Sequence, residues 1–127
     1  MDRHSVMGLT LCALLAATAP ITAHHGAAAY DLAETRALEA IVTEFKWINP
    51  HGLIEFDVRN SAGELQHWTA ETAGLAILVR AGWSKTAIQS GARITVSGHP
   101  ARNGGTTMIL ERIVLADGRV LNNFVPR

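Results

Sequence analysis

The segment Glu44-Phe45-Lys46-Trp47-Ile48-Asn49-Pro50-His51-Gly52 decides how the chain folds, because an apolar run stops there at a turn. Asn49 precedes a proline, which disfavours helix, and Gly52 tolerates the positive φ that a tight chain reversal often needs. The turn therefore presents His51 beside the indole of Trp47 at the end of a strand.

Alternating residues flank this turn on both sides. Residues 36–48 alternate with period two, which predicts a long strand that places Ile41, Thr43, Phe45 and Trp47 on one face and Val42, Glu44 and Lys46 on the other. Residues 53–59 alternate again, with apolar side chains on one face and charges on the other. This pattern is typical of a half-buried antiparallel strand.

The next turn sets a register. Asn60-Ser61-Ala62-Gly63 fits a type I turn followed by a left-handed glycine, the three-residue hairpin loop with a G1 bulge. Counting back from this loop gives three cross-strand neighbours: Trp68 opposite Phe56 on the core face, His67 opposite Asp57 on the outer face, and Glu71 near Leu53. The register therefore brings Glu71 close to His51.

The rest of the chain predicts one helix and two more strands. Residues 73–81 form a helix capped by Thr72 and ended by Gly82, with Leu75, Leu78 and Val79 on one face. Strands follow at 93–98 and 106–116, and Asp117-Gly118 turns the chain into residues 119–121.

The order of these elements is that of a small five-stranded Greek-key barrel of the OB type, mainly β, with one short helix between strands 3 and 4. A flat α+β sheet is the alternative fold. The 127 residues suit one domain, which we place at residues 36–123. The three tryptophans are expected as large core side chains, although Trp47 could instead wall a pocket.

Residues 1–23 have the pattern of a secretory signal peptide: a basic start, a short apolar run and Ala23 before the cut. The alternatives are cleavage after Ala19 and an uncleaved anchor. We expect a periplasmic or secreted protein whose residues 24–35 form an N-terminal arm, with no stable membrane anchor after cleavage.

Composition excludes several classes of protein. The single cysteine, Cys12, lies in the expected signal peptide, so the mature chain would form no disulfide framework. Loss of Asp2 and Arg3 with that segment leaves basic and acidic residues balanced. A neutral chain argues against a nucleic-acid partner, which requires a basic surface.

Histidine is the main candidate for chemistry, because imidazole is a common ligand of copper, zinc and nickel. The α-amine and ring of His24, together with His25 and His51, would make an all-nitrogen site that suits Cu(II). The alternative is that His24 and His25 are a solvated terminus and that His51 bonds to the backbone around Pro50. We expect His67 and His99 to be ordinary surface residues.

A ligand pocket is the second candidate, formed by the corner residues Trp47, Asn49, His51 and Glu71. Glu71 would act as an acid–base partner of His51 or orient its ring. The alternative is that Glu71 is a charge at the start of the helix, where the helix dipole favours an acidic residue. We find no triad, phosphate-binding loop or paired-carboxylate motif, and we expect no enzyme.

The chain resembles a family of small exported bacterial proteins that is catalogued as a domain of unknown function. The matching motifs are His24-His25, Trp47-x-Asn49-Pro50-His51, Trp68-x-x-Glu71, Gly82-Trp83, Gly98-x-Pro100 and Asp117-Gly118. The chain departs from the family at Gly26, where members often have serine. The resemblance implies no activity. The architecture also looks like small copper-carrying OB domains, but their thioether ligands are not matched here.

The expected function is therefore an exported binding module that takes copper or another transition metal through His24, His25 and His51. The alternative is a metal-free domain that holds a protein or small-molecule partner at the corner from Trp47 to His51.

Overall fold

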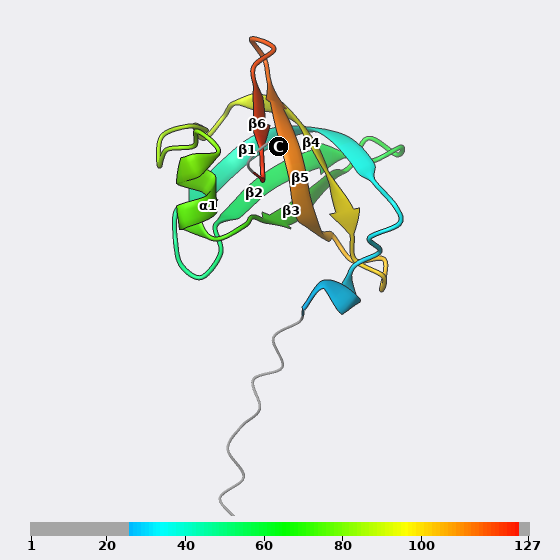
Figure 1. The fold of residues 1–127 in the computed structure, drawn as a ribbon. Coiled ribbons are helices and arrows are strands. Elements are labelled where there is room, and N and C mark those ends of the chain that lie inside the picture. Colours follow the sequence, from blue (N-terminus) through cyan, green and yellow to red (C-terminus); the bar gives the residue numbers. More distant parts are fainter. Residues whose placement is uncertain (1–25, 125–127) are drawn as a thin grey trace, which may run out of the picture.

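The computed structural model describes residues 26–124; the expected signal peptide, the cleavage site, His24 and His25 lie outside these residues. The elements, in order, are η1 (Ala27–Ala29), β1 (Arg36–Lys46), β2 (Leu53–Arg59), β3 (Leu65–Glu71), α1 (Leu75–Arg80), β4 (Arg93–Pro100), β5 (Thr107–Leu115) and β6 (Val120–Asn122). Figure 1 shows the strands wrapped into a barrel with α1 at one end. Among the described residues, no helix has the length and apolar character needed to cross a membrane.

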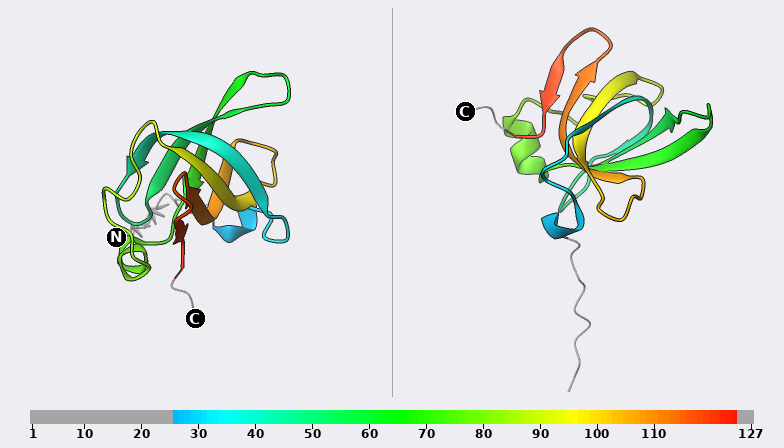
Figure 2. Two further views of the ribbon diagram at one scale, coloured as in Figure 1. Left: turned by 90° about the horizontal axis from the view of Figure 1, so that it is seen from above. Right: turned by 90° about the vertical axis from the view of Figure 1, so that its right-hand side faces the viewer.

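The strands close on themselves in the order expected for an OB-type barrel. Strand β1 pairs antiparallel with both β2 and β4, β2 pairs with β3, and β4 pairs with β5. A parallel pairing of β3 with β5 completes the barrel. The five-stranded barrel prediction is confirmed, and the flat sheet is excluded. A sixth strand, β6, continues from the Asp117-Gly118 turn, and Figure 2 shows the β5–β6 hairpin extending beyond the barrel.

The predicted hairpin register is confirmed. Phe56 lies opposite Trp68, Asp57 opposite His67 and Leu53 opposite Glu71. Gly63 in the connecting loop has a φ of 78°, as the G1-bulge loop requires. The Phe56 and Trp68 rings stack at a centroid distance of 6.4 Å inside the barrel. Trp68 and Trp83 are both buried, in agreement with their expected core role.

The faces of β1 differ from the prediction over its first half. The register shifts between Val42 and Glu44, so one extra residue, Thr43, is accommodated there as a β-bulge. Since side chains alternate with period two, the extra residue inverts the phase. Val42 is 1% exposed and Ile41 is 43% exposed, whereas simple alternation had grouped Ile41 with Phe45. The strand also ends at Lys46, before the predicted end at residue 48.

Helix α1 is shorter than predicted, and Thr72 does not cap it. The N-cap is Gly74, with no side-chain cap bond, and the Thr72 hydroxyl instead donates to the carbonyl oxygen of Ala73 at 2.8 Å. The predicted end is confirmed, because Gly82 has a φ of 90° and the N–H of Trp83 donates to the carbonyl oxygen of Leu78. These are the features of a Schellman motif.

The described part of the N-terminal arm lies against the barrel. Tyr30 is buried and forms a bridge with Ala101, in the connection between β4 and β5. The N–H of Asp31 donates to the carbonyl oxygen of Pro100, and the N–H of Arg102 donates to that of Ala29. Residues 26–35 are therefore fixed to the barrel by main-chain hydrogen bonds.

Candidate functional site

Two histidine–carboxylate groups lie on one face of the barrel. We call this the outer face; it consists of the side chains of β2 and β3 that alternate with buried ones: Leu53, Glu55, Asp57, Arg59, Leu65, His67, Thr69 and Glu71. The loop of residues 47–52 joins β1 to β2 at one end of this face. We call Trp47, Asn49, His51 and Glu71 the corner site.

The ring of His51 is held by one nitrogen. Its Nδ1 lies 2.9 Å from the carbonyl oxygen of Thr72. A carbonyl oxygen only accepts, so Nδ1 carries the proton and donates it. In the neutral ring the lone pair of Nε2 is then free for a proton or a metal ion.

Glu71 lies beside that free nitrogen. Its Oε1 is 3.8 Å from His51 Nε2, and both side chains are partly exposed. The separation exceeds a hydrogen bond but allows an ion pair once the ring is protonated. The predicted proximity of Glu71 and His51 is confirmed.

Gly52 positions this loop through close packing. A Cβ atom at Gly52 would lie 2.8 Å from the Oγ1 of Thr72, which is a buried side chain. Gly52 is absent from the glycines of positive φ, so the expected left-handed turn at this residue is wrong. The glycine is needed because the two segments approach closely, and the N–H of Thr72 donates to the Gly52 carbonyl oxygen at 2.9 Å.

A buried asparagine, Asn123, forms hydrogen bonds that hold the chain next to the corner site. Asn123 accepts a hydrogen bond from the N–H of Ala73 and donates one to the carbonyl oxygen of Leu110, both at 2.7 Å. Trp83 Nε1 donates to the carbonyl oxygen of Asn122, the residue before Asn123. The segment after β6 thus fixes the start of α1 against β5.

The other two corner residues contribute differently. Trp47 is partly buried and packs edge-to-face on Phe45, with ring centroids 5.7 Å apart. Asn49 is exposed, and the Asn49–Pro50 peptide bond is cis. The structure therefore brings His51 and Glu71 together, while Trp47 packs at the rim of the core.

Sequence reasoning missed a second group, which we call the His67 cluster: His67, Asp57, Glu55 and Lys46. His67 Nδ1 lies 2.9 Å from Asp57 Oδ1, and Nε2 lies 2.6 Å from Glu55 Oε2. Lys46 Nζ donates to the other oxygen of Glu55 at 2.9 Å. Since carboxylates only accept, the ring makes both bonds as an imidazolium. The signal was present in the register, which placed His67 opposite Asp57.

Charge neighbours shift the pKa values within the cluster. Hydrogen bonds to Asp57 and then Glu55 raise the pKa of His67 above its ordinary value of 6.5. The hydrogen bond from Lys46 lowers the pKa of Glu55 below 4.5, against the opposing effect of partial burial. Both pKa shifts favour the state in which His67 is protonated and Glu55 is ionised.

The model of a family of unknown function, DUF6152, matches residues 12–110 of the 127. The chain belongs to this family. No curated protein matches, and no solved structure matches. The match extends from before the described residues into β5 and covers both the corner site and the His67 cluster.

Three further histidines of this DUF6152 chain follow the expected signal peptide. His99 Nδ1 donates to the carbonyl oxygen of Glu34 at 2.8 Å. His24 and His25 precede the described residues. Within residues 26–124, no three His, Cys, Asp or Glu side chains form a group that could hold a metal ion. A metal at the corner site would therefore need ligands in addition to His51 and Glu71.

Proposed function

We propose that the chain is an exported binding module that takes up Cu(II) at the corner site. His51 Nε2 is the ligand from the barrel, and His24 and His25 supply nitrogens from the N-terminus left by signal cleavage. The observation that carries this proposal is the hydrogen bond from His51 Nδ1 to the Thr72 carbonyl oxygen. Metal-binding histidines commonly donate their second ring nitrogen in this way, which fixes the tautomer and aims the other nitrogen.

The available donors suit Cu(II). Imidazole nitrogens and a terminal amine fit its preference for nitrogen and oxygen ligands in a tetragonal arrangement. The carboxylate of Glu71, 3.8 Å from His51 Nε2, is a further donor or an electrostatic partner for the cation. Cys12 would be removed with the signal peptide, so no thiolate would compete for the metal.

The attachment of the arm supports a contribution from its first residues. Tyr30 bridges to Ala101, and the N–H of Thr69 donates to the carbonyl oxygen of Thr106 at the end of the same connection. Thr69 is two residues before Glu71 on β3. The arm is thus anchored to the connection that meets β3 at Thr69, and β5 runs from there parallel to β3 towards Glu71.

The test is a Cu(II) titration of the mature chain beginning at His24, followed by visible absorption and electron paramagnetic resonance. We expect about one equivalent to bind, more weakly as the pH falls through the imidazole range near 6.5. His51→Ala should weaken binding by about tenfold or more. One extra residue before His24 should also weaken it, since the amine is displaced.

His99→Ala is the matched control, because its Nδ1 also donates to a backbone carbonyl and its ring belongs to the same fold. It should leave the affinity unchanged. Equal losses in the His51 and His99 variants, or identical spectra with and without copper, would contradict the metal site. Mass spectrometry of the exported protein checks that its first residue is His24.

A metal-free interaction module is the second candidate. Ile48 is 46% exposed in the loop that carries His51, beside the partly buried Trp47. Together the two side chains offer adjoining apolar surface to a protein or small-molecule partner. A chain that fails to bind copper but loses a partner on Ile48→Ser substitution would favour this function.

A further inference from the structure

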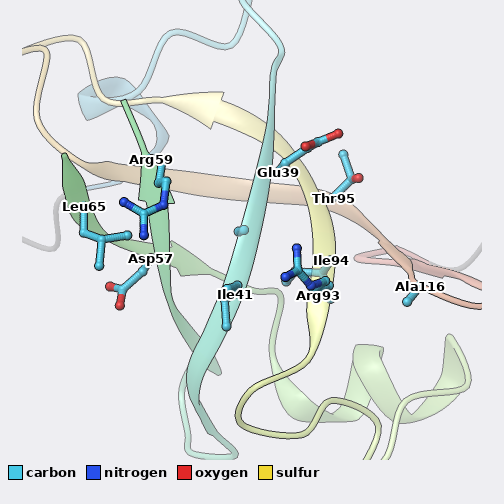
Figure 3. A pocket seen from close by; sticks show the side chains of 10 residues that line it. Glu39, Ile41, Asp57, Arg59, Leu65, Arg93, Ile94, Thr95 and Ala116 are labelled. Atoms are coloured by element: carbon cyan, nitrogen blue, oxygen red, sulfur yellow. The ribbon is translucent and has the colours of Figure 1, made fainter. Parts of the chain in front are cut away.

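A groove crosses the barrel on the outer side of β1, away from the corner site. Its volume is about 660 Å³, within the range of small-molecule sites. Figure 3 shows that it passes over Ile41 on β1, with Arg59 and Leu65 on one side and Arg93 on the other. Three neighbouring strands and the start of β3 therefore contribute side chains to it.

The groove exposes two large apolar side chains, Ile41 and Leu65. Ile41 is 43% exposed because the bulge after Val42 inverts the first half of β1. Leu65 is 60% exposed at the start of β3. Exposed apolar residues that share a concave surface with charges mark binding sites more often than isolated ones do.

The cation of the groove that is free to bind is Arg93. It is the direct cross-strand neighbour of Ile41. Among the hydrogen bonds and ion pairs of residues 26–124, none involves its guanidinium. Arg59, by contrast, donates to the carbonyl oxygen of Gly63 at 2.9 Å and is held in place.

The groove contains two carboxylates, Asp57 and Glu39, and within residues 26–124 only Asp57 is paired with another charged group. Asp57 accepts a hydrogen bond from His67 at 2.9 Å and is paired with that ring. Glu39 lies opposite Thr95, diagonally across from Arg93, and makes no ion pair with it among the described residues. The groove thus presents two guanidinium groups against one unpaired carboxylate, beside an apolar floor.

We propose that this groove binds a free amphipathic monocarboxylate, with the carboxylate on Arg93 and the hydrocarbon part over Ile41 and Leu65. Guanidinium groups bind carboxylates through two parallel hydrogen bonds, which gives the anion a defined position. Arg59 adds favourable charge on the far side of Ile41. This site is independent of the copper site and does not require the N-terminal histidines.

The test is a titration of the isotope-labelled protein with octanoate, followed by amide chemical shifts in NMR. We expect shifts at Ile41, Leu65 and Arg93, and a dissociation constant on the order of 1 mM for so small a ligand. Arg93→Gln should weaken binding about tenfold. Arg112→Gln, an exposed arginine on β5 outside the groove, is the matched control and should have no effect.

Glu39→Gln should tighten binding, because it removes the unpaired carboxylate opposite the ligand. Octylammonium, with the same hydrocarbon and the opposite charge, should not produce these shifts. Equal binding of octanoate and octylammonium, or an unchanged affinity in Arg93→Gln, would overturn the proposal. It would also be overturned if only vesicles of anionic lipid, and not octanoate, perturbed these amides.

Discussion

The corner site and the His67 cluster place a histidine beside carboxylates on the same face of the barrel, yet they differ in which ring atoms are occupied. In the corner site, one nitrogen of His51 is bonded to a backbone carbonyl and the other is free. In the cluster, both nitrogens of His67 are bonded to carboxylates. The partner of each nitrogen, rather than the presence of a nearby acid, decides whether the ring is available to a ligand.

The two regions also differ in what lies behind them. The corner site is supported by the buried side chains of Thr72 and Asn123, which connect the loop, the helix start and β5. Three members of the His67 cluster, Glu55, Asp57 and His67, lie on the β2–β3 ladder, on the face opposite the stacked pair Phe56 and Trp68, and Lys46 joins them from β1. The corner therefore depends on tertiary contacts, and the cluster depends on strand register.

The largest expected effect comes from the residue behind the cluster. Trp68→Ala should lower the free energy of unfolding by about 3–5 kcal/mol, since it leaves a cavity in the barrel core. Leu65→Ala, an exposed position on the same strand, should change it by less than about 0.5 kcal/mol. Urea denaturation measures both. Similar effects at the two positions would mean that the assigned inner and outer faces of β3 are wrong.

The next largest effect should disturb the corner site and leave the His67 cluster unchanged. Gly52→Ala should lower the free energy of unfolding by about 1–3 kcal/mol, because the new methyl group overlaps Thr72 Oγ1. It should also displace His51 and weaken copper binding. Gly105→Ala is the control, since its Cβ would meet only the side chain of Asn103, which is exposed in the connection between β4 and β5. The NMR titration of His67 should be the same in both variants; a shift confined to Gly52→Ala would show that the two regions are coupled.

The smallest effect is the pH dependence of the His67 cluster. The folded-state pKa of His67 is raised above 6.5, so its stabilising contribution is complete below that pH and is lost as the pH rises through the folded-state pKa. The pKa of Glu55 is lowered below 4.5, so its contribution is lost as the pH falls through that lower value. The cluster should therefore stabilise the fold most between the ordinary pKa of Glu55, 4.5, and that of His67, 6.5.

The measurement compares wild type with His67→Gln in urea at about pH 5.5 and about pH 8. The difference in the free energy of unfolding should shrink at the higher pH, and it should stay below about 1 kcal/mol because His67 is exposed. In the Asp57→Asn background, the pH dependence should be reduced. A difference that grows with pH would contradict the imidazolium assignment.

Local patterns in the sequence predicted most of the barrel. The hairpin register followed from a loop that requires positive φ at a position where glycine is favoured, and it correctly paired Phe56 with Trp68 and His67 with Asp57. The same register predicted the contact of Glu71 with His51. The bulge in β1 was missed, because no residue near Thr43 signals an extra position and only the pairing with β2 reveals it.

The sequence by itself determined the order of the elements along the chain, the turn at Gly63, the end of the helix at Gly82 and the closeness of Glu71 to His51, because each depends on residues near one another in the chain or across one hairpin. Tertiary structure alone decided which nitrogen of His51 is free, why Gly52 must lack a side chain, and how Asn123 joins Ala73 to Leu110. These features arise where segments far apart in the chain are pressed together in a close-packed interior, and no local pattern encodes that contact.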